Sequence, residues 1–325
     1  MEFREEKDGL GILNIPKDAY YGIHTLRSLQ NFKISREKWN PKLLNAIVQL
    51  KKACATANHE LKHLSDEKLK YIHQACSDIL SGKHHDQLNL DIYQAGSGTS
   101  TNMNVNEVIS NRAIEISGGI KGDKSIDPHD DVNKGQSTNN VIPSAIRVAS
   151  ILLIQDLIEQ LTHLRNTLKE KAEEFKSILK SGRTHLQDAV PITLGSSFNA
   201  FATTISKHIQ RIKDSQKYLK ELGIGGTAVG TGLNTSPKFR ALILEALNND
   251  LNYDFTVTED GIEATQYLTD IASLSSILKL LAIDMNKMSS DLRLLSSGPI
   301  TGLNEISLPS LEPGSSIMPG KINPS

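Results

Sequence analysis

Three unusually long runs without helix-breaking residues constrain this chain most strongly. Between Pro143 and Gly182 there are 38 residues without Gly or Pro, enough for a helix about 57 Å long at about 1.5 Å per residue. Pro143 fits the first helical turn and Gly182 fits its end. A second run covers 194–223, interrupted only by Gly195, and a third covers 262–297. Because average globular helices have about 11–12 residues, these runs predict an all-α fold with an extended bundle of long helices; a coiled-coil rod is the alternative.

Shorter helices are predicted upstream of these runs. Apolar residues recur at three- and four-residue spacing over 41–64, which marks one face of a helix. Ser65 is the expected N-cap of the next helix, since acidic residues follow it in the first turn. Cys54 and Cys76 lie on the apolar faces of these two helices, so we expect both to be buried as small hydrophobic residues.

The organisation of the chain changes near residue 137. Upstream are shorter helices and irregular segments, and downstream the long runs begin. We therefore predict an N-terminal domain over 1–137 and a central long-helix bundle domain over 138–325.

Composition excludes several classes of protein. The 36 basic and 37 acidic residues nearly cancel, which removes the basic surface that nucleic-acid binding requires. Two cysteines are too few for a disulfide framework or a multi-thiolate metal site. The charged N-terminus lacks the apolar core of a signal peptide, and no window approaches about 18 continuous apolar residues. These features predict a cytoplasmic protein that binds neither nucleic acid nor membrane.

Uncharged hydroxyl and amide side chains concentrate in five Gly-containing or Asn-containing segments. Several of them immediately precede a helical run, where unpaired backbone N–H groups and the positive end of the helix dipole favour an anion. Each segment alone is better explained as a capped helix start, but all five together favour a small ligand with carboxylates. The segments are 96–104, 136–140, 182–187, 225–234 and 314–323.

Nucleotide and metal sites find little support in the motifs. Gly314 to Lys321 resembles a P-loop, but the spacing is one residue too long and Ile322 stands where Ser or Thr should bind magnesium. His84 and His85 form a polar turn more readily than a metal site. No Gly-x-Ser-x-Gly elbow is present. The sequence therefore predicts neither a metal nor a cofactor.

The polar segments resemble motifs of the fumarase/aspartase superfamily. The last segment is similar to the highly specific signature of that superfamily, and the matches extend from near residue 7 to the end of the chain. The resemblance implies mostly helical domains, a twenty-helix core in a homotetramer, and active sites that combine segments of three subunits. The motifs are YYGIHTLR from Tyr20, GSGTSTNMNVNEV from Gly96, DDVNKGQSTNN from Asp130, GRTHLQDAVPITLG from Gly182, GGTAVGTGLNT from Gly225 and GSSIMPGKIN from Gly314.

Two branches of the superfamily compete for this sequence. The aspartase branch is similar in YYGIHTLR, in QSTN with Thr138, in EDGIEATQ from Glu259 and in DLRLLSSGP from Asp291. The class II fumarase branch is similar in NMNVNEVISNRA from Asn102. The resemblance favours the aspartase reaction, release of ammonia from L-aspartate to give fumarate, with malate–fumarate interconversion as the alternative.

The resemblance implies an anti elimination without metal or cofactor. Ser315 would remove a proton from the carbon beside one substrate carboxylate, which then becomes a doubly charged aci-carboxylate stabilised by donors held in place. Thr184 and His185 are expected to act with it in catalysis and to hold the other carboxylate. Asn139 together with His185 would contact the leaving amine or hydroxyl. The implied substrate-binding residues are Thr99, Ser137, Thr138, Asn139, Ser316, Lys321 and Asn323.

The chain also departs from the superfamily pattern. Ile300 replaces the usual Arg after SSGP, Ser196 and Ser197 replace a Gln-Glu pair, and Asn140 ends the QSTN motif where Asp is usual. Family chains continue well beyond the position of Ser325, so the remaining bundle and a C-terminal part are expected to be absent here. A truncated, non-catalytic fragment that binds dicarboxylates or assembles is therefore the alternative of another class.

Overall fold

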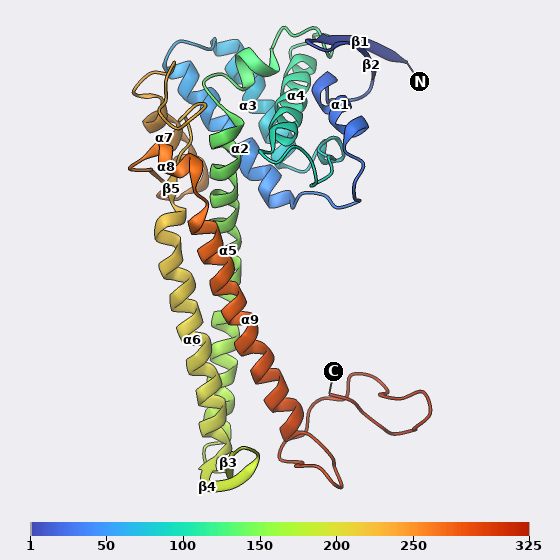
Figure 1. Cartoon of the computed structure of the whole chain (residues 1–325), viewed down its shortest axis with the longest axis vertical. Helices are drawn as coiled ribbons and strands as arrows, with labels where there is room; N and C mark the ends of the chain where they lie inside the picture. The colour runs from blue at the N-terminus through green and yellow to red at the C-terminus, as the bar shows by residue number, and fades with distance from the viewer. Residues whose placement is uncertain (1, 325) are drawn as a thin grey trace. The chain divides into compact units, whose positions relative to one another are not determined.

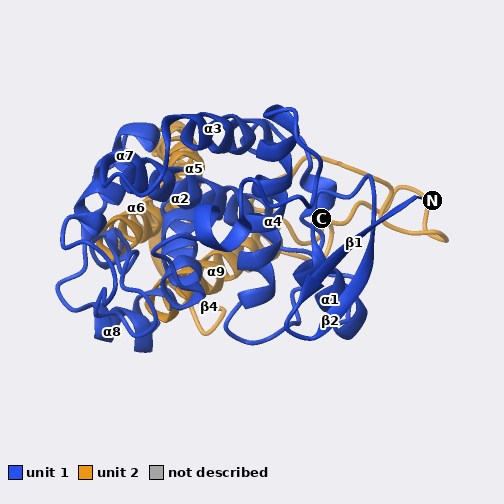
Figure 2. Cartoon of the chain, turned by 90° about the horizontal axis from the view of Figure 1, so that it is seen from above, with its two compact units in different colours: residues 1–153, 216–271 blue, residues 154–215, 272–325 orange. Residues whose placement is uncertain are grey.

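The computed structural model describes residues 2–324, and their contacts divide the chain into two compact units (Figure 2). Unit 1 contains residues 1–153 and 216–271, and unit 2 contains residues 154–215 and 272–325. The units alternate along the chain, whereas the sequence predicts a single boundary after residue 137. Packing contacts do not establish where an independently folding domain ends, so that boundary stays a prediction.

Helices α2, α3 and α4 form the centre of unit 1. Helix α2 packs against α3 and α7, while α4 packs against α3 and α1; Figure 1 shows α1 to α4 in blue to blue-green and α7 in orange. Its elements are β1 (Phe3–Asp8), β2 (Gly11–Pro16), α1 (Ile23–Asn31), α2 (Pro41–Glu60), α3 (Asp66–Leu80), η1 (His85–Gln87), α4 (Thr99–Ile116), η2 (Pro128–Val132), β5 (Glu221–Leu222), α7 (Phe239–Leu251), β6 (Thr256–Val257) and α8 (Gly261–Gln266).

Local sequence signals explain where α2 and α3 begin. The side chain of Asn40 accepts the Lys42 N–H at 2.8 Å, and Pro41 occupies the first helical position, where its missing N–H costs nothing. Ser65 caps α3 as predicted, accepting the Lys68 N–H. Cys54 and Cys76 are fully buried free cysteines, which confirms their predicted role as small hydrophobic residues.

Helix α4 is buried almost completely although many of its residues are polar. Two of its amides are paired with distant segments: Asn104 donates to the Gln87 carbonyl at 3.0 Å, and Asn111 donates to the Tyr20 carbonyl at 2.8 Å. The Asn111 side chain also accepts the Gly122 N–H. The core of unit 1 is therefore fastened by hydrogen bonds as well as by apolar packing.

Unit 2 consists of long helical segments and one hairpin. Buried His208 on α6 contacts Asp284 on α9 at 2.7 Å, which ties these two helices together. Helices α5 and α9 begin in unit 1 and continue into unit 2. The elements are α5 (Thr138–Glu174), β3 (Leu179–Thr184), β4 (Gln187–Thr193), α6 (Leu194–Leu219) and α9 (Thr269–Leu295).

All three long runs are shorter as helices than predicted, and α6 ends at Leu219 rather than near Gly223. Helix α5 begins five residues before Pro143, which lies inside it, and ends at Glu174 rather than near Gly182. The chain turns at Phe175, whose carbonyl accepts the Gly195 N–H at 3.0 Å, and then forms strand β3. Asn139, whose carbonyl loses its usual donor because Pro143 has no N–H, is exposed to water, so the proline is tolerated.

The run over 262–297 is also divided. Tyr267 has an extended backbone and separates α8 from α9, a break that a search for Gly and Pro cannot detect. By contrast, α6 begins at Leu194 as predicted. The all-α prediction is correct for the helix-rich architecture but misses three two-stranded sheets, β1–β2, β3–β4 and β5–β6.

One helix of the described chain is long and apolar enough to cross a membrane. It is α5, with a window of mean hydropathy 1.7 that is half buried within the protein. Polar residues interrupt the apolar residues of α5, so this composition test does not contradict the prediction that no window approaches about 18 continuous apolar residues. Core helices of soluble proteins pass it as well, so the finding is weak support for a membrane span.

Gly195 marks a close approach between α5 and α6. A Cβ added there would lie 2.3 Å from the Ala172 carbonyl oxygen and 2.8 Å from the Lys176 Cα. We predict that Gly195→Ala lowers the free energy of unfolding by about 1–3 kcal/mol, since backbone must move to admit the methyl group. Thermal unfolding measures this, with Gly9→Ala as the control because nothing lies within 4 Å of a Cβ at Gly9. Equal melting temperatures for the two variants would contradict the close approach.

Candidate active site

The first polar segment forms the start of α4. Gly98 is the N-cap, with φ of 79°, and its carbonyl accepts the Asn102 N–H. Thr99 is the first helical residue, and its hydroxyl lies 2.9 Å from that of Ser97. The Thr101 N–H donates to Gln94 Oε1 at 2.9 Å, so the N–H groups that remain at this helix start are those before Thr101, beside two hydroxyls. A helix start of this kind favours an anion such as a carboxylate.

The second polar segment forms the start of α5. The Ser137 carbonyl accepts the Val141 N–H at 3.0 Å, and its hydroxyl accepts the Asn139 N–H at 3.2 Å. Asn139 donates its side-chain amide to the Ala228 carbonyl at 2.8 Å. Thr138 opens the helix. This segment and the Gly-rich segment 225–234 are thus held together by hydrogen bonds.

A cavity of about 370 Å³ lies between these helix starts, entirely within unit 1. Gly96, Ser97, Gly98 and Asn139 supply its polar wall, and apolar side chains including Trp39 supply the rest. The structure thus brings Asn139 beside the segment that carries Thr99, as the sequence predicts. Ser137 and Thr138 adjoin Asn139 in the chain but do not line the cavity.

A buried amide network supports the start of α5. Lys51 is fully buried, and its Nζ donates to Asn133 Oδ1 at 2.7 Å and to Gln136 Oε1 at 2.9 Å. Asn102 and Asn106 on α4 donate to the same Asn133 oxygen. Burial lowers the pKa of the Lys51 ammonium to about 7. Lys51 therefore holds the turn over 133–136, which precedes Ser137, through hydrogen bonds to two uncharged side chains.

Sequence reasoning missed Lys51 as a member of this region. Its position relative to Ile47 and Cys54 follows the spacing of the apolar face of α2. A lysine on an apolar helix face could have indicated a buried polar network, because lysine is almost never fully buried without a partner. Its partner Asn133 lies 82 residues away in sequence, so the pairing was not predictable.

Thr184 and His185 lie at the tip of the β3–β4 hairpin in unit 2. Both side chains are exposed. His185 and Leu186 form the two-residue loop with φ of 53° and 62°. Left-handed backbone costs an L-residue about 1–2 kcal/mol, and neither residue is the Asn or Gly that such hairpin loops favour. The tip that presents Thr184 and His185 is therefore strained.

The signature segment forms an irregular loop in unit 2 that is closed on itself. The Gly314 N–H donates to the Lys321 carbonyl, and the Asn323 amide donates to the Gly314 carbonyl, each at 2.8 Å. The Ser315 hydroxyl oxygen accepts the Ile317 N–H at 3.3 Å and the Met318 N–H at 3.1 Å. Two backbone donors aimed at one hydroxyl oxygen stabilise negative charge on that oxygen.

The ten predicted site residues fall into separate groups. Thr99, Ser137, Thr138 and Asn139 belong to unit 1, and the others belong to unit 2. Among residues 2–324 no hydrogen bond or ion pair joins the hairpin tip to the signature loop. Asn323 uses its amide within the loop, whereas Ser316 and Lys321 are exposed. The assignment of all ten to one site stays a prediction.

The residues that depart from the family pattern have distinct surroundings. Asn140 is buried and donates its amide to the Thr227 carbonyl, a bond that an ionised Asp cannot make. The Ser196 N–H donates to the Thr193 hydroxyl at the start of α6. Ile300 is 91% exposed and contributes to no core.

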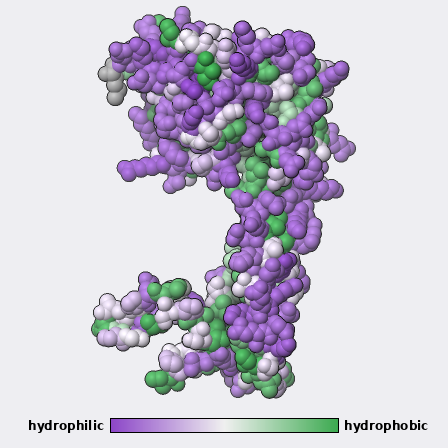
Figure 3. Space-filling model, turned by 180° about the vertical axis from the view of Figure 1, so that it is seen from behind, coloured by the Kyte–Doolittle hydropathy of each residue, from purple (hydrophilic) through white to green (hydrophobic). Residues whose placement is uncertain are grey.

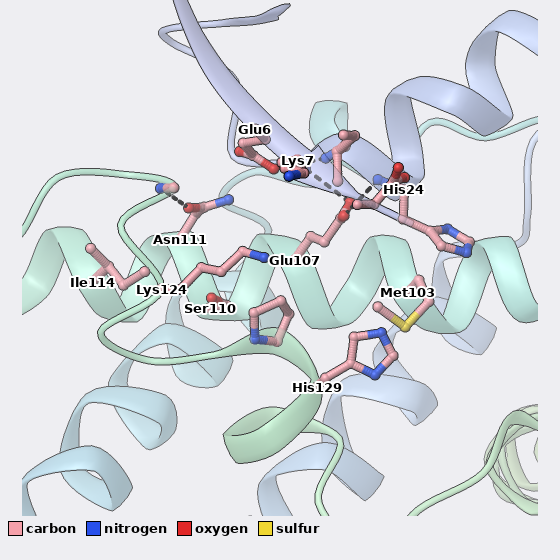
Figure 4. A pocket seen from close by; sticks show the side chains of 15 residues that line it. Glu6, Lys7, His24, Met103, Glu107, Ser110, Asn111, Ile114, Lys124 and His129 are labelled. Carbon is pink, nitrogen blue, oxygen red and sulfur yellow. Dashed lines mark hydrogen bonds between the residues drawn. The ribbon is translucent and has the colours of Figure 1, made fainter. Parts of the chain in front are cut away.

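A second cavity in unit 1, of about 250 Å³, lies between the β1–β2 hairpin, the start of α1 and helix α4 (Figure 4). Its buried Glu107 accepts the N–H groups of Gly22, His24 and Thr25 at 2.9–3.1 Å. Burial raises the pKa of the Glu107 carboxyl, although these hydrogen bonds oppose the shift. These three bonds use the Glu107 carboxylate to cap the start of α1. None of the predicted site residues lines this cavity.

Relatives with known names match nearly the whole chain. Aspartate ammonia-lyases of Pseudomonas canavaninivorans and Bacillus subtilis are 47% and 46% identical to it; each match covers 99% of this chain, and 69% and 68% of the respective relative. The crystal structure of a Brucella melitensis fumarate lyase:delta crystallin has a TM-score of 0.95 and 45% identity, over 99% of this chain and 71% of that one.

A class II fumarase also shares the fold. The Schistosoma mansoni enzyme has a TM-score of 0.96 and 36% identity, with 99% of this chain and 71% of that chain covered. The family described as Lyase matches residues 11–325. The chain therefore belongs to this lyase family, the fumarase/aspartase superfamily whose motifs its sequence carries.

Proposed function

We propose that this protein eliminates ammonia from L-aspartate to give fumarate. The observation that carries the proposal is the 45–47% identity to aspartate ammonia-lyases over 99% of the chain. The aspartase motifs YYGIHTLR and EDGIEATQ, present in full, agree with it.

The geometry of the predicted residues supports an elimination driven by Ser315. Its alkoxide takes the proton from the carbon beside one carboxylate, and the electron pair of that C–H bond moves into the carboxylate. The two backbone N–H groups that donate to Ser315 Oγ favour the alkoxide before this step. The electron pair then returns from the carboxylate to form the C=C bond of fumarate. The C–N bond of the substrate's ammonium group breaks, and ammonia leaves with the electron pair of that bond. Both helix starts in unit 1 supply donors suited to carboxylates.

The protein is further proposed to act as a cytoplasmic homotetramer that completes its site from neighbouring subunits. Helix α9 supports self-association, since Leu278, Leu280, Ile283 and Met285 are each 37–52% exposed. Figure 3 shows apolar side chains interrupting the hydrophilic surface along the long helices. Apolar patches of this kind mark interaction surfaces. In this proposal, α5, α6 and α9 are the long helices of the family's bundle.

Fumarate appearance, followed by ultraviolet absorbance, tests the reaction. L-Aspartate and L-malate are supplied separately to the purified chain, whose oligomeric state is measured in parallel. We expect fumarate from aspartate only. Turnover of malate alone would replace the proposal with the fumarase reaction, which the fold shared with the Schistosoma mansoni class II fumarase favours as second candidate. Absence of turnover with either substrate would overturn both.

A further inference from the structure

One buried carboxylate holds the strand that leads to the hairpin tip. Glu305 Oε1 accepts a hydrogen bond from the Arg183 guanidinium at 2.6 Å, and Lys180 Nζ lies 3.1 Å from Oε2. All three side chains are largely buried, with exposures of 10–20%. Both cations belong to β3, on either side of Gly182. Glu305 thus receives two charges from the strand that ends at Thr184.

Glu305 is itself fixed by its backbone. Its N–H donates to the Leu295 carbonyl at 2.8 Å, at the C-terminal end of α9. Just before it, the N–H of Asn304 donates to the Ser297 carbonyl and that of Leu303 to the Ser297 hydroxyl. The carboxylate therefore connects the hairpin to the rigid end of a 27-residue helix.

The hairpin needs such an anchor. Its tip is strained at His185 and Leu186, and strained backbone persists only where the surroundings hold it. The other carboxylate near Arg183 is that of Asp188, which is 3.6 Å away and 79% exposed. Screening by water makes that contact weak. Burial raises the pKa of the Glu305 carboxyl, but the bonds from Arg183 and Lys180 outweigh burial and keep this pKa below its usual value.

We infer that Glu305 is a positioning residue that fixes the strained hairpin tip, and with it Thr184 and His185, for the elimination. The effect on catalysis rests on the proposed function, whereas the anchoring of the hairpin does not. Eight residues lie between Glu305 and Gly314, so the same segment that anchors the hairpin leads directly into the loop of Ser315. Glu305 thereby fixes the β3–β4 hairpin and also lies where the chain enters the Ser315 loop.

Glu305→Gln tests the inference because it removes the charge and keeps the size of the side chain. In the full chain, we expect amide hydrogen exchange over 183–188 to become at least tenfold faster, while exchange in α2 is unchanged. For aspartate turnover we expect kcat to fall about 10- to 100-fold, the effect of displacing a reacting group by about 1 Å. Asp188→Asn is the matched control, and we expect it to change neither quantity.

A double-mutant cycle separates positioning from general destabilisation. Arg183→Gln and Glu305→Gln should not be additive in kcat, because each breaks the same anchor. Unchanged hydrogen exchange over 183–188 in Glu305→Gln would show that Glu305 does not hold the hairpin. Additive losses in kcat, or an unchanged kcat, would show that holding the hairpin does not contribute to catalysis. If the unmodified chain releases no ammonia, the proposed function fails, while the exchange experiment still decides whether Glu305 holds the hairpin.

Discussion

Ser315→Ala is expected to reduce aspartate turnover by about 10²- to 10⁴-fold, the range over which a positioned general base contributes. Serine is a poor base at its ordinary acidity, so the reaction depends on donors that stabilise its alkoxide. The Ile317 and Met318 N–H groups donate to Ser315 Oγ in the structure. Alanine cannot accept a proton, and the two donors lose their acceptor. Steady-state kinetics with aspartate measure the loss in kcat.

Substrate binding should survive this substitution. The predicted carboxylate-binding residues are untouched, so the dissociation constant of fumarate, measured by calorimetry, should change less than about threefold. Ser316→Ala is the control, because its hydroxyl is exposed and makes none of the hydrogen bonds described for Ser315; it should lower kcat less than Ser315→Ala does. Retained turnover in Ser315→Ala would exclude this hydroxyl as the base.

Lys51→Met is expected to change how stability depends on pH. Burial lowers the pKa of Lys51 to about 7 in the folded chain, whereas an unfolded lysine titrates near about 10.4. The unfolded chain therefore binds this proton more tightly between these values. The resulting cost to stability is fully present below pH 7 and is relieved as the pH rises towards 10, by about 1.4 kcal/mol per pH unit.

Methionine has no proton to bind, so the difference between the two proteins isolates Lys51. Urea unfolding at several pH values between 7 and 10 should show the unmodified chain gaining stability relative to Lys51→Met at every step. Lys52→Met is the control: Lys52 pairs with Asp250 at 2.7 Å near the surface, a contact worth about 0–1 kcal/mol. A constant difference between the unmodified chain and Lys51→Met would show that buried Lys51 is not the group described.

Signals confined to a few neighbouring residues predicted the helices well. Ser65 caps α3 and α6 begins at Leu194 because caps and turns depend on adjacent residues. The break at Tyr267 and the end of α5 at Glu174 escaped prediction. The chain leaves α5 through hydrogen bonds from Leu194 and Gly195, which lie 16 to 20 residues further on, and composition within a helical run does not encode such contacts.

The candidate site was predictable only in its residue types. The motifs identified polar segments that precede helices, although not that α4 begins at Thr99 and α5 at Thr138. They also identified the family, which the relatives confirm. They could not identify Lys51, whose partner is 82 residues distant, or Glu305, which meets Arg183 across 122 residues. Support of this kind arises from tertiary packing. Whether the ten residues act together stays a prediction for the kinetics to decide.

The amide-rich burial of α4 has a consequence for how unit 1 assembles. A collapsed intermediate that excluded water before Asn104 and Asn111 met Gln87, Tyr20 and Gly122 would leave those amides unpaired in a dry interior, and each such group costs about 1–3 kcal/mol. An apolar core can be compact while its side chains are still disordered, but the core of unit 1 cannot, because its amides need their partners. We therefore expect unit 1 to become dry and ordered in a single cooperative step, with no populated molten state.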